Sequence, residues 1–119
     1  MSNPVLNSDK LNFWRQMDPE GGAGFLKKLI AIYLSSAPEF EMQIENAIAA
    51  ADSDALVKAA HTFKSSAANI GADLLADICR QLEDYGDKNH VSKAAKLLAK
   101  MKTESGRVTA ALEELLENG

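Results

Sequence analysis

Residues 25–51, FLKKLIAIYLSSAPEFEMQIENAIAAA, carry the pattern that decides the fold. Apolar residues recur there at alternating spacings of four and three, at Leu26, Ile30, Tyr33, Ala37, Phe40, Ile44, Ala47 and Ala51. This spacing places them along one face of a long helix of the kind found in bundles. Pro38 lies inside the segment, so the helix either kinks or restarts there. We favour a kink, because the pattern keeps its phase across the proline.

Three further segments predict long helices, at residues 53–70, 72–85 and 90–117, because each repeats apolar residues at helical spacing. Asp52 or Ser53 is expected to cap the first of them, and Gly71 to end it. A second break is expected at residues 86–89, GDKN. The expected core positions are Leu56, Ala60, Phe63, Ala67, Ile70, Leu74, Leu75, Ile78, Cys79, Leu82, Val91, Ala94, Leu98, Met101, Ser105, Val108, Leu112 and Leu115.

A shorter helix is expected at residues 8–17, with Ser8 as its cap and Leu11, Phe13 and Trp14 forming an apolar side that covers the core. Residues 18–24, DPEGGAG, then interrupt the chain. No segment alternates with the period of two that marks a strand. The sequence therefore predicts an all-α fold: one domain over residues 1–119, built as an antiparallel up-and-down four-helix bundle with a short extra N-terminal helix.

Composition narrows the possible functions. The net charge of −4, with lysines and acids interleaved, argues against nucleic-acid binding, which needs a basic patch. No apolar run approaches the ~20 residues that span a bilayer, so membrane insertion is not expected. Cys79 is the single cysteine, which leaves no disulfide or paired-thiolate metal site. The start MSNPVLNSDK does not resemble a secretory signal, and we expect a cytoplasmic protein with a protein partner.

A histidine is set among small residues in the stretch HTFKSSAANIGADLL, residues 61–75. Helical geometry points His61 about 140° away from the core positions of its helix, so its ring should face water. On that side its neighbours are Lys58 one turn before, Lys64 and Ser65 one turn after, and Ala68 two turns after. The small side chains of Ser65 and Ala68 keep the imidazole open to another protein.

Such a histidine can accept a phosphoryl group. An exposed imidazole with the ordinary pKa of ~6.5 is mostly neutral at pH 7, and the neutral ring has a nucleophilic lone pair. Lys64 could then make a charge-assisted contact with the bound phosphate. Spacing alone does not establish this role, because most surface histidines beside a lysine are simply solvated.

The sequence from His61 to Glu83 matches a longer pattern that indicates a role for the histidine. His61-Thr62-Phe63-Lys64-Ser65-Ser66, followed by Ile70-Gly71-Ala72, Leu75, Cys79, Leu82 and Glu83, resembles the signature of histidine-containing phosphotransfer (HPt) domains. The pattern of that family is close to H-x-[LF]-K-G-[SA]-[SA]-x-x-[LIM]-G-A-x-x-L-x-x-x-C-x-x-L-E. The chain departs from it at Ser65, where the family most often has glycine. Serine is still small, so access to His61 should survive.

The resemblance implies a role in a phosphorelay. His61 would take a phosphoryl group from the aspartate of one receiver domain and pass it to the aspartate of another, while Lys64 steadies the phosphate. From their positions around His61, Ser65 and Ala68 would keep the ring accessible and Lys58 would help to dock an acidic receiver surface, with an ordinary solvated lysine as the equal alternative for Lys58. The receiver would bring magnesium, so this chain is expected to hold no metal or cofactor. The resemblance favours a monomer, acting alone or as part of a hybrid sensor kinase.

Two other classes of protein share part of this pattern. A sensor kinase usually has an acidic residue after its histidine, whereas Thr62 follows His61, and residues 21–24, GGAG, lack the ending of a phosphate-binding loop. A helical adaptor without covalent chemistry shares the same periodicity and stays the alternative. His90, at the expected start of the last helix, is interpreted as a solvated or capping residue.

Overall fold

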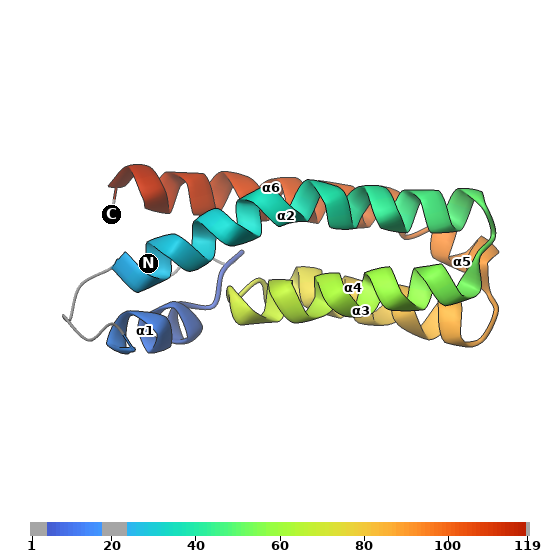
Figure 1. Cartoon of the computed structure of the whole chain (residues 1–119), viewed down its shortest axis with the longest axis horizontal. Helices are drawn as coiled ribbons and strands as arrows, with labels where there is room; N and C mark the ends of the chain where they lie inside the picture. Colours follow the sequence, from blue (N-terminus) through green and yellow to red (C-terminus); the bar gives the residue numbers. More distant parts are fainter. Residues whose placement is uncertain (1–4, 18–23, 119) are drawn as a thin grey trace.

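The computed structural model describes residues 5–17 and 24–118 and has the predicted all-α architecture (Figure 1). Its helices are α1 (Ser8–Gln16), α2 (Gly24–Ala49), α3 (Ser53–Asn69), α4 (Asp73–Asp87), α5 (Val91–Ala95) and α6 (Leu98–Asn118). Helices α2, α3, α4 and α6 run antiparallel in an up-and-down bundle. The predicted four-helix bundle with a short N-terminal helix is confirmed.

Helix α2 is continuous through Pro38, so the restart that was left open as the alternative to a kink does not occur. Figure 1 shows the helix bending along its length, in keeping with the predicted kink. The predicted interruption at residues 18–24 lies outside the described residues, apart from Gly24, the first residue of α2.

The same type of turn joins α2 to α3, α3 to α4 and α4 to α5. At each turn one residue has a positive φ, at Ala51 (52°), Gly71 (83°) and Asn89 (59°). The next amide bonds the carbonyl five residues earlier, as when Asp52 N donates to Ala47 O at 2.9 Å. This is the Schellman motif, which satisfies carbonyls at a helix end. Ala51 was expected inside the helix, but it lies in this turn because alanine gives no glycine-like stop signal.

The prediction of a single last helix at residues 90–117 is wrong in one respect. The structure divides this segment into two helices, α5 and α6. Lys96 and Leu97 lie between them, and their amides bond carbonyls three residues back, at 3.2 and 2.9 Å. These shorter turns interrupt the α-helical ladder. The sequence KAAKLLAK, residues 93–100, has no glycine or proline to signal the interruption.

Helix α1 covers one end of the bundle, next to the turn between α3 and α4 (Figure 1). Its cap is Asn7 rather than the predicted Ser8, since the Asn7 side chain accepts hydrogen bonds from the amides of Asp9 and Lys10. Asn7 N also donates to Gly71 O at 2.7 Å. A Cβ atom on Gly71 would lie 3.0 Å from Asn7 O, so this close approach requires glycine as well as the positive φ.

The core lies between the four long helices, and Phe63 is fully buried at its centre. Its ring packs against those of Tyr33 and Phe40 from α2. Leu74 was predicted to be buried but is 46% exposed, because it lies at the edge of the apolar stripe in the first turn of α4. Among the described helices, none combines the length and the hydrophobicity that crossing a bilayer requires.

Candidate functional site

The ring of His61 faces solvent from the middle of α3, with 60% of the side chain exposed. Its neighbours Ala60 and Phe63 are fully buried, because they belong to the apolar stripe that packs on α2 and α4. The direction predicted for His61 from helical spacing is therefore correct. Asp52 helps to fix the start of α3, since its carboxylate accepts a hydrogen bond from Ala55 N at 3.1 Å.

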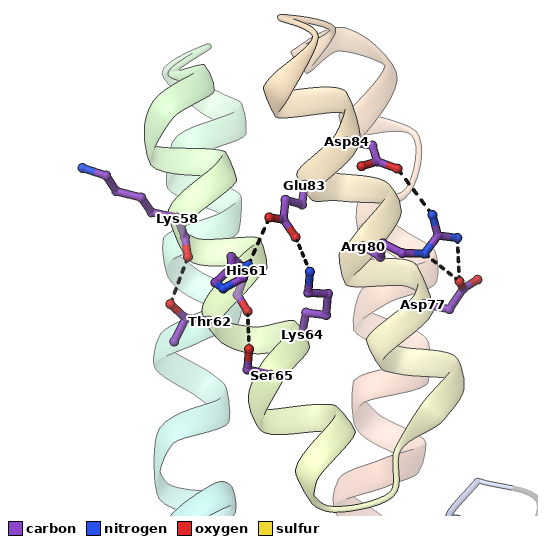
Figure 2. Close-up of polar contacts among 9 residues, drawn as sticks. All are labelled: Lys58, His61, Thr62, Lys64, Ser65, Asp77, Arg80, Glu83 and Asp84. Atoms are coloured by element: carbon purple, nitrogen blue, oxygen red, sulfur yellow. Dashed lines mark hydrogen bonds and ion pairs between the residues drawn. The ribbon is translucent and has the colours of Figure 1, made fainter.

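Glu83 of α4 joins the two predicted residues of the site (Figure 2). One carboxylate oxygen lies 3.1 Å from His61 Nδ1, and the other accepts a hydrogen bond from Lys64 Nζ at 2.7 Å. The side chain of Glu83 is 22% exposed and that of Lys64 is 29% exposed. We call these three residues the His61–Glu83–Lys64 cluster.

The protonation of Glu83 determines which nitrogen of His61 is free. Partial burial acts to raise the pKa of Glu83, but hydrogen bonds from Lys64 and His61 outweigh it and hold the pKa below its ordinary value. Glu83 is therefore an anion at neutral pH and can only accept hydrogen bonds. In a neutral imidazole Nδ1 must then carry the proton, which leaves the lone pair on Nε2, at the far edge of the ring.

The other predicted residues occupy different positions around the ring. Ser65 is exposed, and its hydroxyl donates to the carbonyl oxygen of His61 at 3.1 Å, so it is turned toward the backbone. Ala68 is partly buried one turn beyond Ser65. Lys58 is exposed, and Figure 2 shows its side chain extending away from the His61–Glu83–Lys64 cluster. The structure thus joins His61 to Lys64 through Glu83 and leaves Lys58 apart.

Sequence reasoning assigned no role to Glu83, although it matched the last residue of the quoted pattern. Its partners precede it by 22 and 19 residues. They meet because α3 and α4 form an antiparallel hairpin that reverses at Gly71, which brings these turns side by side.

The described residues contain no group of three or more His, Cys, Asp or Glu side chains able to hold a metal ion. Cys79 is buried in the core, and burial raises the pKa of its thiol to about 12. The thiol is therefore protonated at neutral pH, and it is a poor nucleophile or metal ligand in that form.

Comparisons with known proteins identify the family and the fold. The family model for the Hpt domain matches residues 28–118. This chain belongs to the Hpt domain family. The Hpt domain also resembles the crystal structure of histidine-containing phosphotransfer protein B (HptB) from Pseudomonas aeruginosa PAO1, with a TM-score of 0.89 and 24% sequence identity over 99% of each chain. A comparison with curated proteins finds no significant match.

Membership of this family defines the general activity. The Hpt domain serves as a histidine phosphotransfer relay in two-component signalling, and its partners are phosphorelay proteins such as response regulators. On the surface of the bundle, the ring of His61 has an anion on its Nδ1 side, and the same carboxylate holds the cation of Lys64.

Proposed function

We propose that His61 is the phosphoryl-carrying residue of this Hpt domain. Its Nε2 lone pair attacks the phosphorus of an aspartyl phosphate on a receiver domain, forming the N–P bond. The P–O bond to the aspartate breaks, and the aspartate leaves as a carboxylate. The proton on Nδ1 stays in place, so the product ring carries a positive charge. Transfer to the next receiver reverses these steps.

The observation that carries this proposal is the contact between Glu83 and His61 Nδ1 at 3.1 Å. The carboxylate selects the tautomer with a free Nε2 before the reaction, and it stabilises the positive ring that forms when Nε2 attacks. Both effects require an anion on the Nδ1 side of the ring and open solvent on the Nε2 side. The 60% exposure of His61 supplies the second condition.

In this proposal Lys64 steadies the transferred phosphoryl group. Its ammonium has three N–H donors, and one of them is used by Glu83 Oε1. The remaining donors can bond phosphoryl oxygens while the ion pair with Glu83 is kept. The receiver supplies magnesium and the acceptor aspartate, the exchange takes place in the cytoplasm, and the Hpt domain acts as a monomer.

Phosphoryl transfer from a receiver tests the assignment of His61. The host's receiver domains, phosphorylated with acetyl phosphate, would be mixed with the wild type, with His61→Gln and with His90→Gln. We expect the wild type and His90→Gln to gain an acid-labile, base-stable phosphate, whereas His61→Gln gains none and stays folded by circular dichroism. Acceptance by His61→Gln would refute the site.

The same experiment separates phosphotransfer from the adaptor alternative. A helical adaptor would bind a receiver without acquiring phosphate, so binding of the wild type by every receiver tested with no transfer would overturn the proposal. His90 is an exposed histidine before α5 that makes no side-chain capping bond, which makes His90→Gln the matched control.

A further inference from the structure

Two lysines flank His61 on α3, and their ammonium groups are in different states. Lys64 is ion-paired with Glu83 at 2.7 Å, so its charge is neutralised within the cluster. Lys58 is exposed and makes no side-chain hydrogen bond or ion pair with any residue of 5–17 or 24–118. Figure 2 shows the two side chains extending to opposite sides of the helix. The uncompensated positive charge near His61 therefore comes from Lys58.

The α4 side of His61 is acidic. The guanidinium of Arg80 on α4 is ion-paired with Asp77 at 2.7 Å and with Asp84 at 3.4 Å (Figure 2). Those two carboxylates outnumber the single guanidinium, and Asp73 and Asp87 are exposed on the same helix. An acidic partner surface approaching along α4 would meet charge of its own sign.

The opposite side of His61 has fewer exposed carboxylates, namely Asp54 one turn before Lys58 and Glu39, which accepts a hydrogen bond from Gln43. Between α2 and α3 lies an open groove of about 490 Å³, and Lys58 and Thr62 form part of its wall. Across the groove, α2 contributes the neutral side chains of Gln43 and Asn46. The carboxylate in the wall, Asp52, is used as the cap of α3. This groove presents a free cation and neutral polar groups one turn from His61.

We propose that Lys58 is the docking cation of this Hpt domain and that it contacts the acidic rim around the phosphorylated aspartate of a receiver. This inference rests on the proposed function. The receiver then covers the α2–α3 groove and His61, and leaves the exposed edge of α4 free. Lys64 and Lys58 have separate tasks: Lys64 acts inside the cluster, and Lys58 guides the partner to it.

The two tasks leave different kinetic signatures. An exposed charge at the rim of an interface mainly affects the association rate, and its effect is screened by salt. Removing Lys58 should raise the KM for the phosphorylated receiver and leave the maximal transfer rate unchanged. It should also leave direct phosphorylation by phosphoramidate unchanged, because that small donor needs no docking. In that reaction Nε2 attacks phosphorus and ammonia leaves.

The test compares Lys58→Gln with Lys58→Arg and Lys93→Gln over a series of salt concentrations. Lys93 is an exposed lysine of α5 with no ion pair among the described residues, so it controls for net charge. At low salt we expect Lys58→Gln to raise KM about three- to fivefold, with the difference vanishing at high salt. Lys58→Arg and Lys93→Gln should behave as the wild type.

Three outcomes would overturn this inference. They are an unchanged KM in Lys58→Gln at low salt, an equal rise in KM in Lys93→Gln, or a loss of phosphoramidate reactivity in Lys58→Gln. Failure of the proposed function looks different, because wild-type protein would then accept no phosphate from any receiver. Loss of the maximal rate with an unchanged KM would place Lys58 in the chemical step rather than in docking.

Discussion

Two groups of polar side chains in this bundle have opposite surroundings. In the His61–Glu83–Lys64 cluster, at the surface, both oxygens of the carboxylate have a partner. In the core, the hydroxyls of Tyr33 and Ser105 are buried and interact with each other. Neither makes a hydrogen bond of ordinary length and angle in the part of the chain that the structure describes. Burial raises the pKa of Tyr33, which keeps its hydroxyl neutral.

The comparison separates groups that serve chemistry from groups that only occupy the core. A connected surface cluster can hold a charge, set a tautomer and meet a partner. A buried hydroxyl without a partner costs free energy and can do none of these. Changes in the cluster should therefore act mainly on phosphoryl transfer and only slightly on stability, while changes at the buried hydroxyls should alter stability and leave transfer unchanged.

Among changes that leave His61 in place, the largest effect is expected from Glu83→Ala, which removes the anion behind the ring. Transfer should fall about 10- to 100-fold, the range seen when the hydrogen-bond partner that orients a metal-ligating histidine is removed. The rate with phosphoramidate should fall as well, because the defect lies in His61 itself. Asp84→Ala is the matched control, since Asp84 is the adjacent carboxylate and bonds Arg80 instead. Equal rates for Glu83→Ala and Asp84→Ala would remove Glu83 from the mechanism.

Ser65→Arg should reduce transfer from receivers by roughly tenfold or more, because a long cation beside His61 obstructs the partner. Ser65 is exposed, so thermal unfolding should be unchanged. The reaction with phosphoramidate should continue near the wild-type rate. Undiminished transfer from receivers would show that a small residue is not needed at this position.

A change in the core should give the opposite pattern. Tyr33→Phe deletes a buried hydroxyl whose interaction with Ser105 falls outside ordinary hydrogen-bond geometry, and we expect it to stabilise the fold by about 1 kcal/mol. Urea unfolding measures this difference, and the rate of phosphoryl transfer should not change. A loss of stability would reveal that the hydroxyl has a bonding partner in solution.

The smallest effect is the dependence of stability on pH. The folded pKa of Glu83 is lowered, so its stabilising contribution is complete above the unfolded pKa of ~4.3 and is lost as pH falls through the folded value. Glu83→Gln should be less stable than the wild type at pH 6, and the gap should close as the pH falls below about 4. A gap that stays constant over this range would contradict the lowered pKa.

Much of the fold could be predicted from the sequence because the apolar spacing has a direct physical meaning. The stripe through Leu26, Tyr33 and Ile44 can be buried only by other helices, and these residues are buried. Predicted ends of the first four helices differ from the observed ends by at most two residues. The break at Lys96 and Leu97 could not be predicted, because no residue there disfavours a helix and the interruption reflects tertiary packing.

The site was predictable to a smaller extent. Spacing along α3 was enough to place His61 in solvent and Lys64 one turn away. It did not indicate that Lys64 is held by a carboxylate of α4, because a contact between helices depends on their relative register. Lys58 and Lys64 look alike in the sequence, and only the position of Glu83 distinguishes the paired lysine from the unpaired one.

Nuclear magnetic resonance of the phosphorylated protein tests the central claim most directly. With ¹⁵N-labelled histidine, coupling between phosphorus and nitrogen identifies the atom that carries the phosphoryl group. We predict a single phosphorylated histidine, His61, with phosphorus bonded to Nε2 and the proton still on Nδ1. Phosphorus on Nδ1 of His61, or on either nitrogen of His90, would contradict the role given to Glu83 and the mechanism built on it.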